Sequence, residues 1–355
     1  PADPSTPAGS TYLATEAQYE QAVSAAVKAF EVTRKMPAYE RGAILRKISE
    51  GIRARREELI TLMAREAGKP VRDAAVEVDR ASLTFRLGAE EAERIYGELI
   101  PLDIAASSKG RTGITRRFPI GPIAGISPFN FPLNLAVHKI APAIASGNPI
   151  VLKPPSKDPL TMLTVTEIIE EAGAPKGSVS VLPMSRELGD RMVSDERFKL
   201  LTFTGSPSVG WAMKAKAGKK KVVLELGGNA GVIVDRSANL DWAVKRILVG
   251  AFAYSGQVCI SVQRIFVHDA VYDAFMSKFL DGARALIRTV TTNGDGRVDG
   301  PLLEGRDFTV GHYELCFHAG AYLRSLGVKL SEPPFLDFIP LRFGIADADQ
   351  AFHNS

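Results

Sequence analysis

The stretch IGPIAGIS (residues 120–127) begins the part of the chain that decides its fold. It is the first of several short apolar runs, rich in β-branched residues, that alternate with helical segments. The strand-like runs are 120–127, 149–153, 178–182, 200–204 and 222–226. The helical segments between them are 133–145, 160–172, 187–193 and 207–217. This alternation predicts an α/β fold with a parallel sheet, right-handed crossovers and helices on both faces, and ligands at the carboxyl ends of the strands.

The segments on either side of this alternation extend the architecture. Before it, apolar residues at three- and four-residue spacing, such as Ile44, Ile48 and Ile52, predict long packing helices. These helices are expected over 16–36, 39–69 and 74–97. After it, we expect a strand over 230–234, a helix over 240–253, a loop around Cys259, a strand over 262–268 and a helix over 271–287.

The composition excludes several classes of protein. The 355 residues are 45% hydrophobic and 24% charged, which is typical of a globular protein and not of a disordered or fibrous one. No apolar run is long enough for a membrane span, and the first residues do not resemble a signal peptide, so we expect a cytoplasmic protein without a membrane partner. Two cysteines, Cys259 and Cys316, form neither a disulfide framework nor a metal cluster unaided, which favours a reducing compartment and no metal.

The charge is unevenly distributed along the chain. The net charge is +7 over residues 1–287 and −3 over residues 288–355, within a total of +4. The pI is about 9, yet no basic stripe interleaved with aromatic residues is present, so we expect no nucleic-acid partner. The sign change indicates that a different kind of segment begins near residue 288.

Cys259 is the candidate nucleophile. It lies in SGQVCIS (255–261), where Ser255 and Gly256 keep the surroundings open. A lone cysteine is more often a small buried hydrophobe, but an exposed loop thiolate attacks carbonyl carbon readily.

Glu225 and Asn130 are the candidate acid–base and oxyanion groups. Glu225 lies in LELGGN (224–229) at the end of an apolar strand, where burial would tune it as a general base; otherwise it is bonded to backbone amides. Asn130 lies in PFNFP (128–132), between two prolines that fix the backbone. Its amide either donates to an oxyanion or serves only the turn.

Two further strand ends carry possible phosphate and ribose contacts. Gly205 and Gly210 in FTGSPSVG (203–210) follow a strand and open a helix, a place where a helix N-terminus receives phosphate. The spacing is not the G-x-G-x-x-G fingerprint, so this signal is weak by itself. Lys153 in LKPPS (152–156) ends another strand and is either a phosphate or ribose ligand or a solvated lysine.

Taken together and in this order, these motifs resemble the aldehyde dehydrogenase superfamily over residues 11–287, including the 34-residue spacing from Glu225 to Cys259. The resemblance implies a Rossmann-like parallel sheet and NAD(P)-dependent oxidation of a small aldehyde. Cys259 would form a thiohemiacetal and then a thioester, and Asn130 and the backbone N–H of Cys259 would hold the oxyanion. Glu225 would activate the hydrolytic water.

The resemblance also implies how the cofactor is bound. Lys153 would bind the adenosine ribose and Ser206 would lie near the pyrophosphate. Ser156 stands where a carboxylate in the family favours NAD, so NADP and NAD both remain open. The residues expected around the cofactor are Lys153, Ser156, Gly205, Ser206, Gly210, Pro128, Phe129, Leu226 and Gly227. The substrates implied are small polar aldehydes such as lactaldehyde, phosphonoacetaldehyde or glyceraldehyde 3-phosphate, and the family assembly implies a homo-oligomer.

After residue 287 the sequence departs from that family and lacks its E-x-F-G-P motif. Residues 288–355 instead resemble the transthyretin-like 5-hydroxyisourate hydrolases of purine breakdown, in TTNGDGR (291–297), GHYELCFHAGAY (311–322) and PPFLDFIPLRFGIAD (333–347). This implies a partial β-sandwich in which Arg297 and His353 are either remnants of a hydrolase site or orphaned sandwich residues.

The sequence therefore predicts two partial enzymes joined near residues 287–289. The expected domains are a cofactor-binding domain with N-terminal helices (1–228), a truncated catalytic domain (229–287) and the transthyretin-like segment (288–355). Besides aldehyde oxidation, two other functions are open: 5-hydroxyisourate hydrolysis by the tail, and NAD(P) binding without catalysis.

Overall fold

The computed structural model describes residues 7–283, 311–329 and 339–345. The chain divides into two compact units, Pro1–Phe279 and Leu280–Ser355, which are described separately. Arg297, His353 and the predicted end of the helix 271–287 lie outside the described residues.

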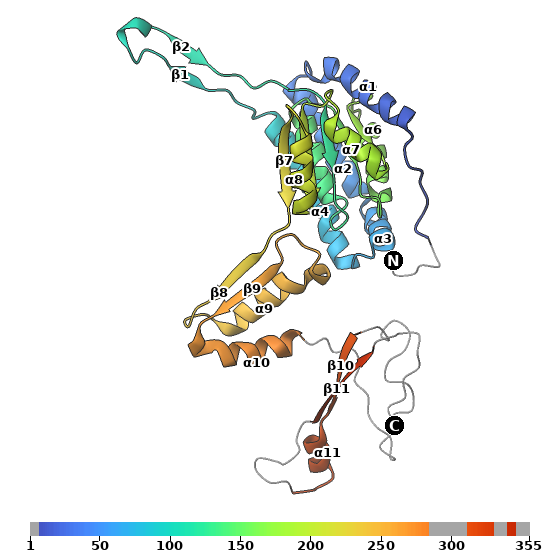
Figure 1. Cartoon of the computed structure of the whole chain (residues 1–355), viewed down its shortest axis with the longest axis vertical. Helices are drawn as coiled ribbons and strands as arrows, with labels where there is room; N and C mark the ends of the chain where they lie inside the picture. The colour runs from blue at the N-terminus through green and yellow to red at the C-terminus, as the bar shows by residue number, and fades with distance from the viewer. Residues whose placement is uncertain (1–6, 284–310, 330–338, 346–355) are drawn as a thin grey trace. The chain divides into compact units, whose positions relative to one another are not determined.

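A five-stranded parallel sheet forms the centre of the first unit (Figure 1). Its strands are β3 (Ile123–Ile126), β4 (Ile150–Lys153), β5 (Val179–Val181), β6 (Leu200–Gly205) and β7 (Lys221–Leu226). The spatial order is β5-β4-β3-β6-β7, so the chain runs outward from β3 in one direction and then returns to build the other half. The predicted α/β fold with a parallel sheet is confirmed, and the order reverses between β3 and β6, where such sheets bind ligands.

Helices cover both faces of this sheet. The crossover helices are α5 (Asn134–Ala145), α6 (Leu160–Glu171), α7 (Arg186–Ser194) and α8 (Pro207–Lys216). The N-terminal helices are α1 (Glu16–Thr33), α2 (Ala38–Ala54), α3 (Arg56–Ala67) and α4 (Val71–Ala92). One core cluster joins α2 to α6 through residues such as Ile48, Phe85 and Ile140, and a second joins α1 to α7 and β6 through Tyr19 and Phe203.

The predicted continuous helix over 39–69 is wrong, because the chain forms two helices there. Arg55 leaves helical geometry between α2 and α3 (φ −98°, ψ 23°), and its guanidinium binds Glu58 in α3 and Glu167 in α6. The break lets the apolar stripes of both helices face α4. Gly68 then ends α3 with φ +67°, a conformation that glycine adopts easily.

A two-stranded antiparallel ribbon leaves the body of the first unit (Figure 1). It consists of β1 (Leu99–Pro101) and β2 (Thr112–Ile114), with a 3₁₀ turn (η1, Ala106–Ser108) between them. Apolar residues on it are largely exposed, including Leu99, Ile104 and Ile114. These strands were not predicted from the sequence.

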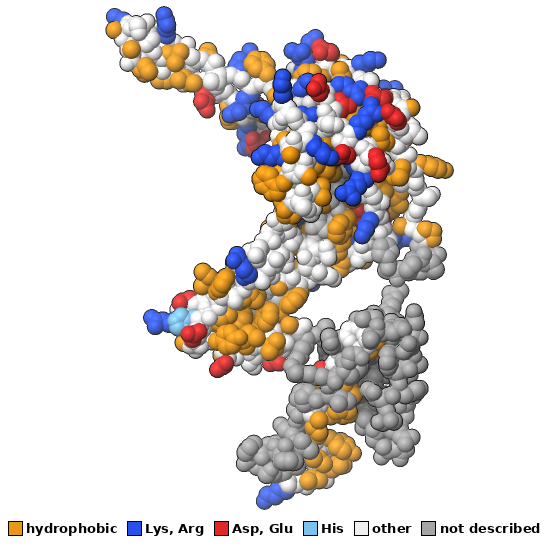
Figure 2. Space-filling model, viewed as in Figure 1, with side chains coloured by type: hydrophobic (Ala, Val, Ile, Leu, Met, Phe, Trp, Pro, Cys, Tyr) orange, Lys and Arg blue, Asp and Glu red, His pale blue; other side chains and the backbone are white. Residues whose placement is uncertain are grey.

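The part of the first unit after β7 has a separate small core. Here β8 (Ala230–Val234) pairs in parallel with β9 (Val262–Val267), and α9 (Leu240–Phe252) and α10 (Tyr272–Ala283) accompany them with the 3₁₀ turns η2 (Ala253–Gly256) and η3 (Asp269–Val271). The buried residues of this core are Val234, Val244, Ile247 and Phe275. Ile233 and Phe266 in the strands and Trp242 in α9 are largely exposed, and Figure 2 shows hydrophobic side chains gathered over this part.

In the second unit the described residues form an antiparallel pair, β10 (Gly311–Phe317) with β11 (Ile339–Ile345), and the short helix α11 (Ala319–Ser325). The strands come from two of the tail motifs that carry the transthyretin-like resemblance.

Candidate active site

Cys259 lies in the loop between η2 and β9, and its side chain is exposed. Three successive residues with positive φ, Tyr254 (49°), Ser255 (51°) and Gly256 (75°), turn the chain sharply before it. The loop is closed by two hydrogen bonds of Ser261, whose N–H donates to Val258 O and whose Oγ donates to Ala251 O. An exposed thiol on a fixed loop is available to a small electrophile.

Asn130 lies in the turn between β3 and α5 and connects this turn to the Cys259 loop. Its Nδ2 donates to the carbonyl oxygen of Gln257 at 2.8 Å, two residues before the cysteine. Its Oδ1 accepts the N–H of Phe131 at 3.1 Å. Because an amide NH₂ carries two hydrogens, one remains for a further acceptor.

Glu225 lies in β7, and the expectation that it closes a buried strand is wrong. β7 is an edge strand, along which exposed and half-buried residues alternate, and Glu225 is on the exposed side. Gly227 and Gly228, which follow β7 in the sequence, bring the chain close to the Cys259 loop. A methyl group added at Gly228 would lie 3.0 Å from the carbonyl oxygen of Cys259. The backbone segments of all three candidate catalytic residues therefore meet around this loop.

Lys139 of α5 is a charged residue beneath this site that the sequence analysis missed. It is buried, and its Nζ donates to Thr204 Oγ1 in β6 at 2.6 Å. Burial lowers the pKa of Lys139 to about 8, and the negative charge of Glu225 acts in the opposite direction. The available signal was a lysine in the helical run 135–145, which is apolar apart from His138 and this lysine.

The predicted pyrophosphate residues lie where β6 ends and α8 begins. Ser206 is the N-cap of α8, but its side chain makes no capping hydrogen bond, so it does not satisfy the N–H groups of the first turn, where Pro207 carries none. A methyl group at Gly205 would lie 2.4 Å from the Phe203 ring, and one at Gly210 would lie 2.5 Å from Leu226 Cδ2. Glycine at these two positions therefore allows the turn and α8 to pack closely against Phe203 and Leu226.

Lys153 and Ser156 lie together at the end of β4. Lys153 Nζ donates to Ser156 Oγ at 3.2 Å, and burial lowers the pKa of the lysine. The lysine stem lies against Gly189 of α7, where an added methyl group would be 3.1 Å from Cδ.

The remaining cofactor residues line the same edge. Phe129 after β3 is exposed beside half-buried Pro128, and Leu226 and Gly227 close β7, with Gly227 beside Pro207 of α8. All of these strand ends lie on one edge because the strands are parallel. The helix N-terminus without a side-chain cap and the lysine–serine pair fit a dinucleotide.

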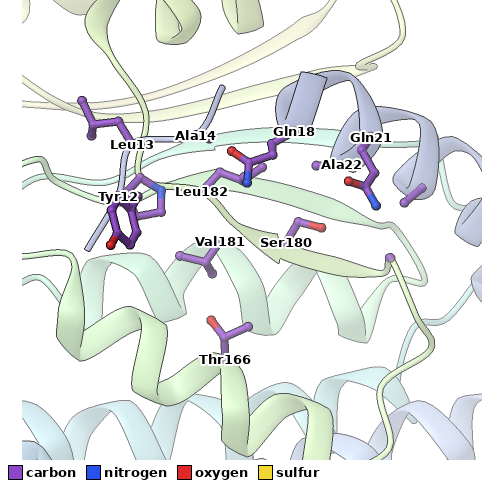
Figure 3. Close-up of a pocket in the computed structure, with 13 residues that line it drawn as sticks. Tyr12, Leu13, Ala14, Gln18, Gln21, Ala22, Thr166, Ser180, Val181 and Leu182 are labelled. Atoms are coloured by element: carbon purple, nitrogen blue, oxygen red, sulfur yellow. The ribbon is translucent and has the colours of Figure 1, made fainter. Parts of the chain in front are cut away.

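A separate groove of about 490 Å³ lies beside the edge strand β5 (Figure 3). Tyr12 and Gln18 from the N-terminal side, Thr166 of α6 and Ser180 of β5 line it, and none of the predicted site residues does. Within the described ranges, no group of three or more His, Cys, Asp or Glu side chains could hold a metal ion, and no helix is both long and apolar enough to cross a membrane.

Comparison with known proteins identifies the family. Residues 1–308 match the aldehyde dehydrogenase family, and residues 272–354 match the HIUase/Transthyretin family. The chain therefore belongs to the aldehyde dehydrogenase family and carries a transthyretin-like C-terminal segment. Both resemblances found in the sequence are confirmed.

The relatives include enzymes of known chemistry. A 3-sulfolactaldehyde dehydrogenase of Priestia aryabhattai is 42% identical over 282 residues, which cover 79% of this chain and 59% of the relative. Aldehyde dehydrogenase 21 from Physcomitrella patens, solved with its reaction product succinate, has a TM-score of 0.74 and 49% identity, covering 76% of this chain and 56% of that one. Glyceraldehyde-3-phosphate dehydrogenase GapN from Methanocaldococcus jannaschii, complexed with NADP, has a TM-score of 0.73 and 41% identity, covering 77% and 59%. The chain thus spans less than two thirds of the length of these relatives.

Proposed function

We propose that this chain carries the cofactor-binding region and the nucleophile of an NAD(P)-dependent aldehyde dehydrogenase. The observation that carries the proposal is the meeting of three loops around Cys259. Asn130 is hydrogen-bonded to Gln257, and Gly228, behind Glu225, lies against the cysteine's carbonyl oxygen. The family match over residues 1–308 supports the same function.

The chemistry begins with the thiolate of Cys259. Its sulfur attacks the aldehyde carbon, a C–S bond forms, and the carbonyl electron pair moves to oxygen. The resulting oxyanion accepts hydrogen bonds from the backbone N–H of Cys259 and from the remaining amide hydrogen of Asn130. The hydrogen bond from Asn130 to Gln257 orients that amide.

The second half of the reaction removes the acyl group from sulfur. When bound, the nicotinamide supplies the hydride acceptor that converts the thiohemiacetal to a thioester. Glu225 then accepts a proton from water, the hydroxide attacks the thioester, the C–S bond breaks and the electron pair returns to sulfur. Exposure of Glu225 gives water access to it, and the buried charge of Lys139 lies within electrostatic reach.

The cofactor would be held by the carboxyl edge of the sheet. Lys153 and Ser156 would bind the adenosine ribose, and Ser206 with the first-turn N–H groups of α8 would bind the pyrophosphate. Ser156 places no carboxylate against a 2′-phosphate, so we propose NADP, with NAD also accepted. The NADP complex of the Methanocaldococcus jannaschii relative supports this choice.

The proposed substrate is a short polar aldehyde that carries an anionic group. The relatives are named for 3-sulfolactaldehyde and glyceraldehyde 3-phosphate, and one was solved with succinate. We also propose that the chain forms a homo-oligomer through the exposed β1–β2 ribbon. A reducing cytoplasmic location would keep Cys259 a free thiol. The proposed domain boundaries lie at residues 228 and 287.

The test is reduction of NAD and NADP by the full chain with 3-sulfolactaldehyde, glyceraldehyde 3-phosphate and succinate semialdehyde. Cys259→Ala should remove turnover completely while leaving NADP binding intact, and Cys316→Ala is the matched control that should keep it. Absence of turnover in the unmodified chain, or turnover that survives Cys259→Ala, contradicts the proposal. NADP binding without turnover would instead select a binding protein without catalysis.

A second candidate is hydrolysis of 5-hydroxyisourate by the C-terminal segment. The match of residues 272–354 to the HIUase/Transthyretin family favours it. Loss of substrate absorbance faster than the spontaneous rate, and abolished by Arg297→Ala, is the expected result. A rate that Arg297→Ala leaves unchanged contradicts it.

A further inference from the structure

Lys69 is a buried cation that none of the proposed catalytic steps uses. It lies between Gly68 and Pro70, in the turn that joins α3 to α4. Its ammonium forms an ion pair with Glu77 of α4 at 2.5 Å, and the two side chains are 0% and 1% exposed. A fully buried lysine is uncommon and requires partners for its charge.

The other partners of this ammonium belong to the two loops of the candidate active site. Nζ donates to the backbone carbonyl oxygen of Asn130 at 2.9 Å. It also lies 3.6 Å from the ring centroid of Phe131, next to Asn130, and 4.4 Å from the ring centroid of Tyr254, at the start of the Cys259 loop. Those two rings meet edge to face at 6.2 Å. A single charge therefore contacts both loops.

Glu77 is the counter-ion and also holds the Asn130 turn. Its Oε1 accepts the N–H groups of Leu133 and Asn134, where α5 begins. Asp158 lies within electrostatic reach of the ion pair, but burial and the neighbouring carboxylates Glu66 and Glu77 raise the pKa of Asp158 to about 8. At neutral pH Asp158 is therefore mostly uncharged, and Glu77 balances Lys69.

One of the two rings that Lys69 contacts, that of Tyr254, belongs to a residue with a strained backbone conformation. Among the described residues, Tyr254 and Ser255 are the non-glycine residues with positive φ. A tyrosine rarely adopts this conformation unless surrounding contacts hold it. A desolvated cation over the ring is such a contact.

We propose that Lys69 is a positioning residue that holds the Asn130 turn and the Cys259 loop in register through its cation–π and carbonyl contacts. Its role in catalysis rests on the function proposed above, but its role in ordering the two loops does not. Loss of the ammonium should release both loops together while the sheet stays intact.

The test compares three variants of the full chain by hydrogen exchange and mass spectrometry. Lys69→Met alone would leave Glu77 as an unpaired buried carboxylate, so the informative variant is Lys69→Met with Glu77→Gln. The control is the unmodified chain, and Glu77→Gln alone, which keeps a carbonyl acceptor for α5 but leaves the ammonium without its counter-ion, measures the cost of that unpaired charge. Lys69→Arg, which keeps a cation over the rings, is the rescue variant.

We expect the double variant to exchange roughly tenfold faster or more over residues 128–133 and 253–261 than the unmodified chain, which matches the strength of desolvated cation–π contacts. Peptides from β3, β4 and β6 should exchange at unchanged rates, and Lys69→Arg should stay near the unmodified chain. Equal rates in the double variant and the unmodified chain overturn the proposal. Faster exchange throughout the sheet also overturns it, because Lys69 would then be a general structural residue.

A kinetic measurement separates this proposal from the proposed function. If the chain oxidises aldehydes, the double variant should lower kcat much more than it raises KM for NADP, because Lys69 contacts the loops that carry Asn130 and Cys259, whereas Lys153, Ser156 and Ser206 lie at or after the ends of other strands. If the unmodified chain shows no turnover, the proposed function fails and the exchange result still decides the role of Lys69.

Discussion

The five-stranded sheet and the β8–β9 pair are both parallel, yet they are covered very differently. β3 is buried along its whole length between two layers of helices. In the β8–β9 pair, Ile233 is 83% exposed and Phe266 is 54% exposed. Parallel strands are ordinarily buried on both faces. Within the described residues, the proposed cofactor site therefore rests on a complete core, whereas the Cys259 loop depends on contacts with the Asn130 turn.

The largest expected effect comes from removing one phenylalanine from each core. Phe85 and Phe275 are 0% and 1% exposed. Phe85→Ala should lower the free energy of unfolding by about 3–5 kcal/mol and weaken NADP binding, because it leaves a cavity in the large core that supports the sheet. Phe275→Ala should cost only about 1–3 kcal/mol, since its small core collapses more easily, and should leave NADP binding unchanged.

Urea unfolding monitored by circular dichroism, together with NADP titration of both variants, checks this pair. Equal losses of stability, or loss of NADP binding in Phe275→Ala, would show that the two regions form one cooperative core and would break the comparison.

An intermediate effect is expected from the buried acid Asp158 beside the sheet. Burial raises its pKa from the ordinary value of 3.8 to about 8. The folded chain therefore keeps a proton that the unfolded chain releases, so this group makes stability fall as the pH rises from about 4 to about 8. Asp158→Asn should remove this slope and stabilise the chain by about 1–3 kcal/mol at pH 8.

Melting temperatures measured at pH 5 and pH 8 decide the point. Lys139 does not interfere, because its pKa is lowered from 10.5 to about 8. The pH range in which this lysine changes the free energy of unfolding therefore lies mainly above pH 8. A pH slope that is the same in Asp158→Asn and the unmodified chain would contradict the expectation.

The smallest effect on stability is expected at Ile233. Because this side chain is already exposed, Ile233→Thr should change the free energy of unfolding by less than about 0.5 kcal/mol. The substitution should nevertheless reduce self-association, because it removes apolar surface from an uncovered strand. Ile150→Thr, at a 0% exposed position in β4, is the matched control and should destabilise clearly. Light scattering and urea unfolding measure both; strong destabilisation by Ile233→Thr would mean that β8 is covered.

The sequence predicted structure correctly where the structure of a segment depends on the residues of that segment alone. The runs at 149–153 and 200–204 predicted strands because most of their side chains are apolar or β-branched, which suits buried parallel strands, and β4 and β6 lie there. The position of Cys259 in an open loop was likewise legible from Ser255 and Gly256 beside it.

It was less informative where a residue's role depends on a distant partner. The break at Arg55 depends on Glu167, which is 112 residues away, and the exposure of Glu225 depends on β7 being an edge strand. Lys69 and Lys139 are ordinary lysines in the sequence, and their burial is visible only once helices α4 and α5 are packed. The roles of the catalytic and cofactor residues remain predictions.

The core clusters on the two faces of the central sheet are built from different ranges of residues. The buried residues of the cluster beneath α2 to α6 lie between Ile44 and Ala172, and partly buried residues as late as Leu200 of β6 also pack against it. The opposite face joins Tyr19 and Val23 to residues as late as Ala217. Helix α1 packs against β4 and β5, so during synthesis its apolar side stays exposed until the chain from Ile150 onward has been made. Helices α2 and α4 can instead pack on each other as soon as both are made, so the N-terminal helix is covered later than they are.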